Sequence, residues 1–239
     1  MTTVLDHDEH VRTQIPARVP WALIAGGVFF FVGGAMHPEE DPPDVTLKEH
    51  LRVMYEDGNW YASHTLQLIG VVLVAVALVA LARSGALVSS RHAQRVGVVA
   101  AVGAVGWAFG SFLHLIAATE ADRIAADRST PLTDALIVVE TITVPVFCLG
   151  VVLLAVVGLR TGLVGNRTAA ACALVGGVAY AVAGATFAFT DALDPLFPLA
   201  SFIGVWAVVT GVSMLRRRTA SAPRQGRDEG GLLGEAVTS

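Results

Sequence analysis

Four ionisable side chains lie near the ends of long apolar segments, where charge is costly. They are His37, His64, His114 and Glu140. Imidazole and carboxylate groups on facing helices are ligands for Zn, Fe, Mn or Cu. Two imidazoles at one depth on opposed helices could bind a b-type haem. Histidine also titrates near neutral pH, so the same group could relay protons or cations. The residue types therefore leave three kinds of chemistry open.

The four candidate residues share one depth in the predicted membrane. Each lies 19 or 20 residues along the chain from an arginine at the other end of its apolar segment. In a helix this separation is about 28–30 Å, close to the roughly 30 Å thickness of the hydrocarbon layer. All four side chains are therefore expected just inside one boundary of the bilayer. The pairs are Arg18–His37, His64–Arg83, Arg95–His114 and Glu140–Arg160.

The three chemistries use these residues differently. All four would be ligands in a metal site, and His64 and His114 would be the axial ligands of a haem. Ser63, Gln67 and Asp191 lie near the same level and would support either site. An alternative hypothesis needs no ligand. Close to the boundary these side chains can reach water, so burying them costs less than it would at the centre of the bilayer. They would then be polar contacts between helices.

The composition is that of a membrane protein. Hydrophobic residues make up 54% of the chain and charged residues 15%, whereas soluble proteins contain about 25% charged residues. The apolar residues form long blocks instead of recurring at helical spacing. We therefore predict an all-α integral membrane protein with six transmembrane helices between residues 19 and 218. The expected spans are 21–36, 60–82, 97–118, 131–159, 168–189 and 195–215.

A short amphipathic helix is predicted in the acidic loop after the first span, over residues 46–57. Thr46 and Glu49 have the spacing of a capping box. Apolar side chains then recur at helical intervals, which favours a helix lying on the membrane surface, as a connector or as a lid. The apolar positions are Leu47, Leu51 and Met54.

The arginines predict the orientation of the chain. Most Lys and Arg residues lie in the two tails and in the loops after the second and fourth spans. We expect the chain to span the plasma (inner) membrane, and the positive-inside rule places both termini on its cytoplasmic side. Residues 1–18 and 219–239 are expected to be cytoplasmic tails, the second of them disordered. The opposite surface is acidic and would concentrate cations.

The first two pairs of spans look like repeats of each other. A shift of 77 residues places Gly33 on Gly110 and His37 on His114. The third pair carries the same glycine spacing, with Ala188 in place of the histidine. The sequence therefore predicts three pseudo-repeated helical hairpins. Glycines on one helix face let a neighbouring helix approach closely, so the histidines are expected on faces that contact other helices.

One motif resembles those of known membrane proteins. His37-Pro38, an acidic loop and then Trp60-Tyr61-Ala62-Ser63-His64 opening an apolar span resemble a broad group of uncharacterised bacterial multi-pass membrane proteins. The resemblance covers roughly the first 85 residues and implies a location, not an activity. Histidines on several spans are more loosely similar to membrane hydrolases that hold zinc. Those usually have seven spans and differently placed Ser and Asp partners, so no residue role is carried over.

No enzymatic signature accompanies the histidines. The chain has no HExxH, GxSxG or phosphate-binding loop, and whether it is an enzyme stays open. The sequence predicts a polytopic plasma-membrane protein of undetermined activity, with a His/Glu cluster near the outer face as a candidate site for a transition metal or haem b. The alternatives are a proton- or cation-coupled small-solute transporter and a structural or assembly protein without a ligand. The expected partners are the lipid bilayer and a small molecule or cation, but not nucleic acid; the sequence leaves the oligomeric state open.

Overall fold

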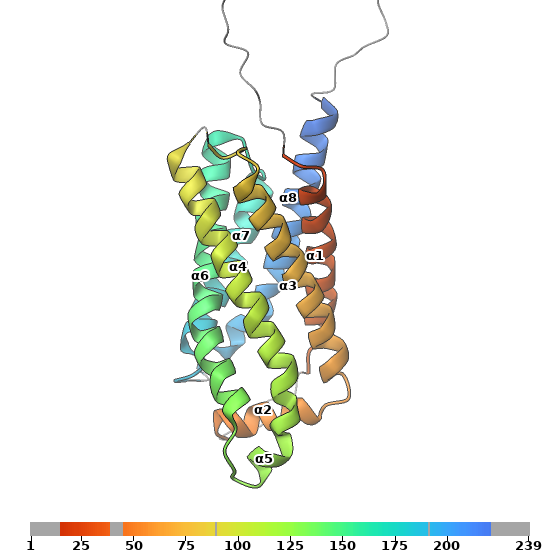
Figure 1. Ribbon diagram of the computed structural model, residues 1–239, viewed down its shortest axis with the longest axis vertical. Helices are drawn as coiled ribbons and strands as arrows, with labels where there is room; N and C mark the ends of the chain where they lie inside the picture. The colour runs from red at the N-terminus through yellow and green to blue at the C-terminus, as the bar shows by residue number, and fades with distance from the viewer. Residues whose placement is uncertain (1–14, 39–44, 89, 191, 221–239) are drawn as a thin grey trace, which may run out of the picture.

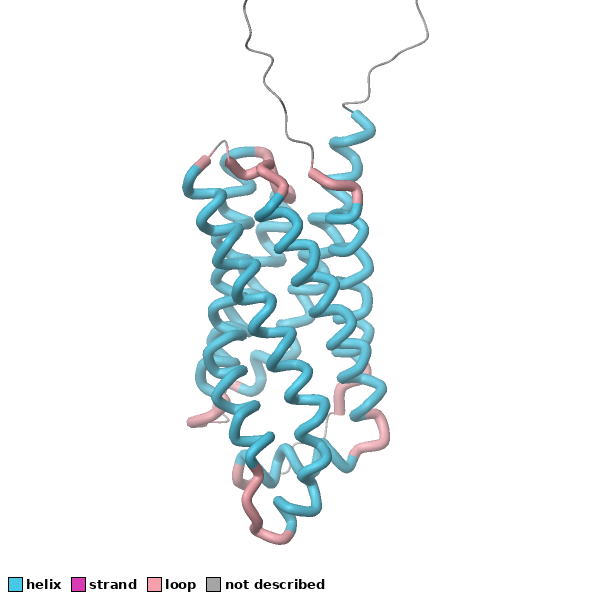
Figure 2. The backbone as a smooth tube through the Cα atoms, in the orientation of Figure 1, coloured by secondary structure: helices cyan, strands magenta, loops and turns pink. Residues whose placement is uncertain are grey.

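The computed structural model describes residues 15–38, 45–88, 90–190 and 192–220. All regular structure in these ranges is helical (Figure 2). Six helical segments are long and apolar enough to cross a membrane, as predicted. Their main helices are α1 (Arg18–Ala35), α3 (Trp60–Arg83), α4 (Arg91–Ala117), α6 (Pro131–Thr161), α7 (Arg167–Thr186) and α8 (Ser201–Ala220). The shorter elements are α2 (Leu47–Glu56), η1 (Ala118–Glu120), α5 (Ala121–Ala125) and η2 (Asp194–Ala200).

The predicted tails, residues 1–18 and 219–239, lie largely outside the described residues. The beginning of α1 and the end of α8 lie at the same end of the bundle, with α2 and α5 at the other end (Figure 1). Which end faces the cytoplasm stays a prediction from the arginines. The three pseudo-repeated hairpins also stay a prediction.

The six long helices form a closed ring in chain order. Each packs against the next, from α1 through α3, α4, α6 and α7 to α8, and α8 packs back against α1. Large aromatic side chains fill the ring. Trp107 of α4 is the centre of this packing: its ring centroid lies 5.1 Å from that of Phe30, 4.4 Å from Phe147 and 5.8 Å from Tyr180. The core is therefore packed with apolar side chains, mainly Val, Leu and Ala around these aromatic rings.

Glycines set the close approach of neighbouring helices. A Cβ atom on Gly103 would lie 2.6 Å from the Cα atom of Phe147 in α6. A Cβ atom on Gly70 of α3 would lie 2.5 Å from the backbone nitrogen of Phe30 in α1. Side chains of any size would push these backbones apart. The prediction that the glycine faces contact other helices is thus confirmed, and the ends of the same faces carry the histidines.

The sixth span begins where the sequence predicts it, because the apolar helical segment runs from Asp194 to Ala220. Its first part, Asp194–Ala200, is the 3-10 helix η2, and α8 begins only at Ser201. Pro195 and Pro198 explain this division. Proline has no amide hydrogen to donate to the carbonyl four residues earlier, so an α-helix cannot be established across this pair.

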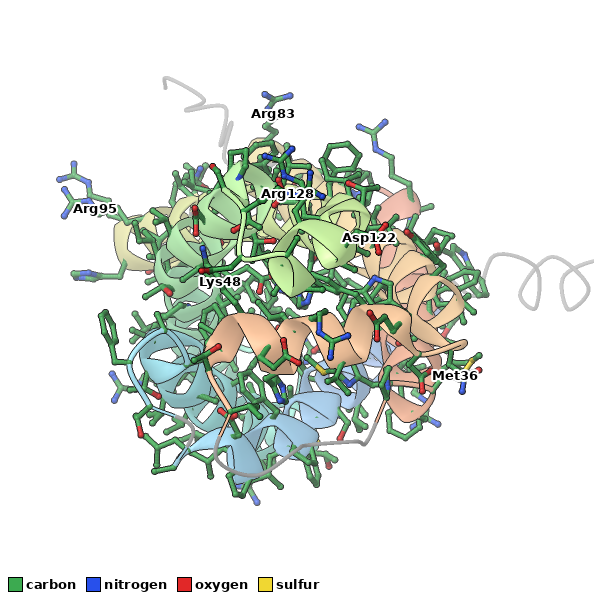
Figure 3. The ribbon with its side chains drawn as sticks, turned by 90° about the horizontal axis from the view of Figure 1, so that it is seen from below. Met36, Lys48, Arg83, Arg95, Asp122 and Arg128 are labelled. Carbon is green, nitrogen blue, oxygen red and sulfur yellow. The ribbon has the colours of Figure 1, made fainter. Side chains whose placement is uncertain are left out.

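Helix α2 lies across one end of the bundle, as Figure 3 shows from that side. Its predicted cap is present, because Thr46 Oγ1 accepts a hydrogen bond from the Glu49 amide at 3.3 Å. Its apolar stripe faces the bundle. Leu51, Met54 and Tyr55 are buried against the ends of the long helices, because the mouth of the ring offers an apolar surface that would otherwise be exposed. Whether α2 acts as a lid or as a connector stays open.

The polar contacts of two side chains, Lys48 and Glu120, hold this end of the fold together. Lys48 at the start of α2 forms an ion pair with Asp134 at 2.7 Å and donates a hydrogen bond to Thr130 at 2.9 Å. Glu120, which is buried after α4, accepts hydrogen bonds from the backbone nitrogen and the hydroxyl of Thr133 at 2.9 and 3.0 Å. This carboxylate pairs with a donor in the first turn of α6 and joins α4 to α6, the two helices that carry His114 and Glu140.

Candidate functional site

The four candidate residues lie together at the α2 end of the bundle. His37 follows α1, His64 lies in α3, His114 in α4 and Glu140 in α6. The ring centroids of His37 and His64 are 5.0 Å apart, and those of His64 and His114 are 4.8 Å apart. His114 Nδ1 lies 3.2 Å from Glu140 Oε1. We call these residues the imidazole cluster.

Each imidazole in the cluster has its Nδ1 atom engaged. His37 Nδ1 donates to the carbonyl oxygen of Pro38, and His64 Nδ1 donates to that of Trp60, both at 2.9 Å. A carbonyl oxygen only accepts, so these two Nδ1 atoms carry the hydrogen. Their neutral rings therefore present a bare lone pair on Nε2. His114 directs Nδ1 to Glu140, and its buried Nε2 has no hydrogen-bond partner among the described residues.

Trp60 is a member of the site that the sequence reasoning missed. Its ring stacks on that of His64 with 3.6 Å between centroids and an interplanar angle of 25°. It also lies 5.1 Å from the ring of His114 and is fully buried. The signal was the four-residue spacing between Trp60 and His64, which places two side chains on one helix face.

Helix α2 covers the cluster through Trp60. The Tyr55 ring packs edge-on against Trp60 with 4.8 Å between centroids. Under this cover His64 is only 5% exposed, and the side chains of His114 and Glu140 are 19% and 13% exposed. Burial of this degree removes most of the water that would stabilise charge on an imidazole.

His37 lies at the edge of this cover. Burial lowers its pKa below the ordinary value of 6.5, although the hydrogen bond to the Pro38 carbonyl acts in the opposite direction. His37 is therefore neutral at pH 7. A surface depression of about 350 Å³ lies between the next residue, Pro38, and the C-terminal end of α2. The depression is lined by Pro38, Val53, Met54, Glu56, Asp57 and Gly58.

Two predicted supporting residues connect helices instead of contacting the imidazoles. Ser63 Oγ donates to the carbonyl oxygen of Gly33 at 2.9 Å, and Gln67 Nε2 donates to Ser63 Oγ at 3.1 Å. The first contact fastens α3 to α1, and the second, within α3, holds the Ser63 hydroxyl in place. The third predicted supporting residue, Asp191, lies outside the described residues.

The donor atoms of the cluster do not surround a common point. Across the described ranges of the chain, no group of three or more His, Cys, Asp or Glu side chains is arranged to hold a metal ion. A haem held between His64 and His114 would need ring centroids more than about 6 Å apart, because each iron–nitrogen bond adds about 2 Å. The observed separation of 4.8 Å leaves no room for the porphyrin.

The site therefore consists of three imidazole rings in contact, of which His64 is buried and His37 and His114 are partly buried, with the Glu140 carboxylate beside His114. Such groups can exchange protons one at a time without surrounding an ion. No protein-family model, curated protein or solved structure matches the chain.

Proposed function

We propose that this polytopic membrane protein takes up and releases protons through the imidazole cluster, as the coupling step of a small-solute transporter. The contact between His114 and Glu140 carries the proposal. A histidine beside a carboxylate within a membrane bundle can hold a proton between the two groups, and such pairs are typical of proton pathways.

Two further imidazoles lie in a row toward this pair. His37 precedes Pro38, which lines the surface depression; the His64 ring follows at 5.0 Å and the His114 ring at a further 4.8 Å. The Nδ1 hydrogens of His37 and His64 stay hydrogen-bonded to backbone carbonyl oxygens, so a proton would enter and leave these two rings through Nε2. The route leads from the edge of α2 to Glu140 inside the ring of helices.

Two buried atoms support a polar occupant along this route. Trp60 Nε1 is a donor and His114 Nε2 an acceptor, and neither has a hydrogen-bond partner within the part of the chain that the structure describes. Buried polar atoms are hydrogen-bonded in the great majority of cases. A water molecule could accept a hydrogen bond from Trp60 Nε1 and donate one to His114 Nε2, and it could carry a proton between the rings.

Proton flux in proteoliposomes tests the proposal. Vesicles with an entrapped pH-sensitive dye would receive a potassium diffusion potential that drives protons inward. We expect the protein to accelerate acidification over empty vesicles and Glu140→Gln to abolish the effect. His92→Gln, which alters an exposed histidine of α4, is the control and should match the unmodified protein. Equal rates in empty and protein-containing vesicles, with and without candidate solutes, would refute the proposal.

A transition-metal site is the second candidate, because the Nδ1 atoms of all three imidazoles are engaged. Histidines that bind a metal through Nε2 generally donate Nδ1–H to a carbonyl or carboxylate, as His37, His64 and His114 do here. Ring rotations would have to bring the Nε2 atoms onto one point. Metal analysis after dialysis against Zn²⁺ or Co²⁺ tests this candidate: one ion per chain, lost in His64→Gln, supports it. Substoichiometric metal in both proteins excludes it.

A further inference from the structure

A second feature lies at the opposite end of the bundle, where α7 begins and α8 ends (Figure 1). A groove of about 520 Å³ runs between these two helices. It is lined by Asn166, Thr168, Val208, Val209, Val212, Ser213, Arg216, Arg217 and Ala220. The groove plays no part in the proton route, which lies at the α2 end.

The lining of the groove divides into an apolar part and a polar part. The apolar part consists of Val208, Val209 and Val212 on α8, all of which are partly exposed. The polar part lies at the end of the bundle, where exposed Arg216 and Thr168 contribute side chains from the two helices. A ligand that fills the groove therefore needs an apolar portion and a polar head.

Arg217 joins the end of α8 to the turn that precedes α7. Its guanidinium group donates to the carbonyl oxygens of Gly162 and Gly165 and to Ser213 Oγ, the last at 3.3 Å. Ser213 Oγ in turn donates to the Gly165 carbonyl oxygen at 3.3 Å. These contacts fasten the α6–α7 turn to α8, so the shape of the groove is set by the fold.

The charge around the groove is positive. Arg167, Arg216, Arg217 and Arg218 lie at this end of α7 and α8, and neither helix contains an Asp or Glu residue. Arginine binds phosphate oxygens through two parallel hydrogen bonds. Basic pockets between membrane helices are typical sites for anionic lipid headgroups.

We propose that the groove binds an anionic phospholipid of the surrounding bilayer. One acyl chain lies along the three valines, and the headgroup phosphate accepts hydrogen bonds from Arg216 and Thr168. The apolar half distinguishes this ligand from free phosphate, and the arginines distinguish it from a zwitterionic lipid. Since Arg217 is engaged with backbone carbonyls, Arg216 is the residue whose charge selects the lipid.

Native mass spectrometry of the detergent-solubilised protein tests this site, with phosphatidylglycerol and phosphatidylcholine of identical acyl chains as probes. We expect the protein to retain phosphatidylglycerol over phosphatidylcholine, and Arg216→Gln to reduce this preference by about fivefold. Arg216→Lys should keep most of it. Arg218→Gln removes a charge from the same helix end outside the groove and is the matched control.

A second variant tests the apolar half. Val212→Phe narrows the groove without changing charge, and it should reduce the retention of both lipids. Equal retention of the two lipids by the unmodified protein would overturn the proposal. An Arg218→Gln effect as large as that of Arg216→Gln would do the same, since it would indicate a diffuse basic surface. Displacement of the lipid by millimolar inorganic phosphate would show that the site recognises phosphate alone.

Discussion

Nδ1 of His114 in α4 lies 3.2 Å from Oε1 of Glu140 in α6, because Gly110 lies one turn before the histidine. A Cβ atom on Gly110 would lie 3.0 Å from Glu140 Cγ. The glycine thus leaves space for the carboxylate chain to turn toward the imidazole. Helix packing and the polar pair therefore depend on the same helix face.

The His114–Glu140 pair should contribute measurably to stability. We expect His114→Gln and Glu140→Gln each to lower the free energy of unfolding, with a coupling energy of about 1–3 kcal/mol in the double-mutant cycle. Denaturation in mild detergent with increasing SDS measures all four proteins. Additive single effects would show that the two side chains do not act as a pair.

Close helix contact at Gly103 predicts a clear cost for a small substitution. In Gly103→Ala the new Cβ atom meets the backbone of Phe147 at 2.6 Å, and the backbone cannot move aside as a flexible side chain would. We expect a loss of about 1–3 kcal/mol, larger than the roughly 1 kcal/mol that alanine gains over glycine in a helix.

Gly34→Ala is the control for this substitution, because a Cβ atom on Gly34 has nothing within 4 Å among the described residues. Its unfolding free energy should equal or slightly exceed that of the unmodified protein. A stable Gly103→Ala protein would mean that α4 and α6 are not in close contact.

We expect His37 to lower the stability of the folded protein in acid. Burial lowers its pKa in the folded protein below the ordinary 6.5, so the unfolded chain binds the proton more strongly. The contribution of His37 is constant above about pH 6.5 and decreases as the pH falls below that value. Thermal unfolding between pH 4 and 8 should therefore show a shallower acid decline for His37→Gln than for the unmodified protein. Parallel curves for the two proteins would contradict the burial of His37.

Substitutions in α2 should change the free energy of unfolding by different amounts at buried and at exposed contacts. Leu51 is 3% exposed, so Leu51→Ala should cost about 2–5 kcal/mol. The ion pair of Lys48 with Asp134 is half exposed, so Lys48→Met should cost less than about 1 kcal/mol.

The same two variants test the cover over His64. Loosening α2 in Leu51→Ala should increase the rate at which diethyl pyrocarbonate modifies His64, measured by peptide mass spectrometry. Lys48→Met should leave the rate nearly unchanged. If the reagent modifies His64 in both variants at the rate seen in the unmodified protein, α2 does not limit access to the cluster.

Much of the architecture was predictable because it depends on local properties. The length and apolarity of each segment predict six long helices, and the Thr46–Glu49 spacing predicts the start of α2. The distance of each histidine from an arginine predicts a shared level. The Pro195 and Pro198 positions could also have predicted a late start for α8, because the missing amide hydrogens are visible in the sequence.

Other features depend on contacts between residues far apart in the chain. Periodicity shows that α2 has an apolar face, but not that this face covers the mouth of the ring. Depth places His64 and His114 at one level, but a level does not specify which ring stacks on Trp60 or where each Nδ1 hydrogen points. The closure of the ring by α8 against α1 likewise depends on a contact between segments far apart in the chain. Hydropathy and helical spacing act within a segment, whereas the neighbour of each face is selected by packing among all six helices at once.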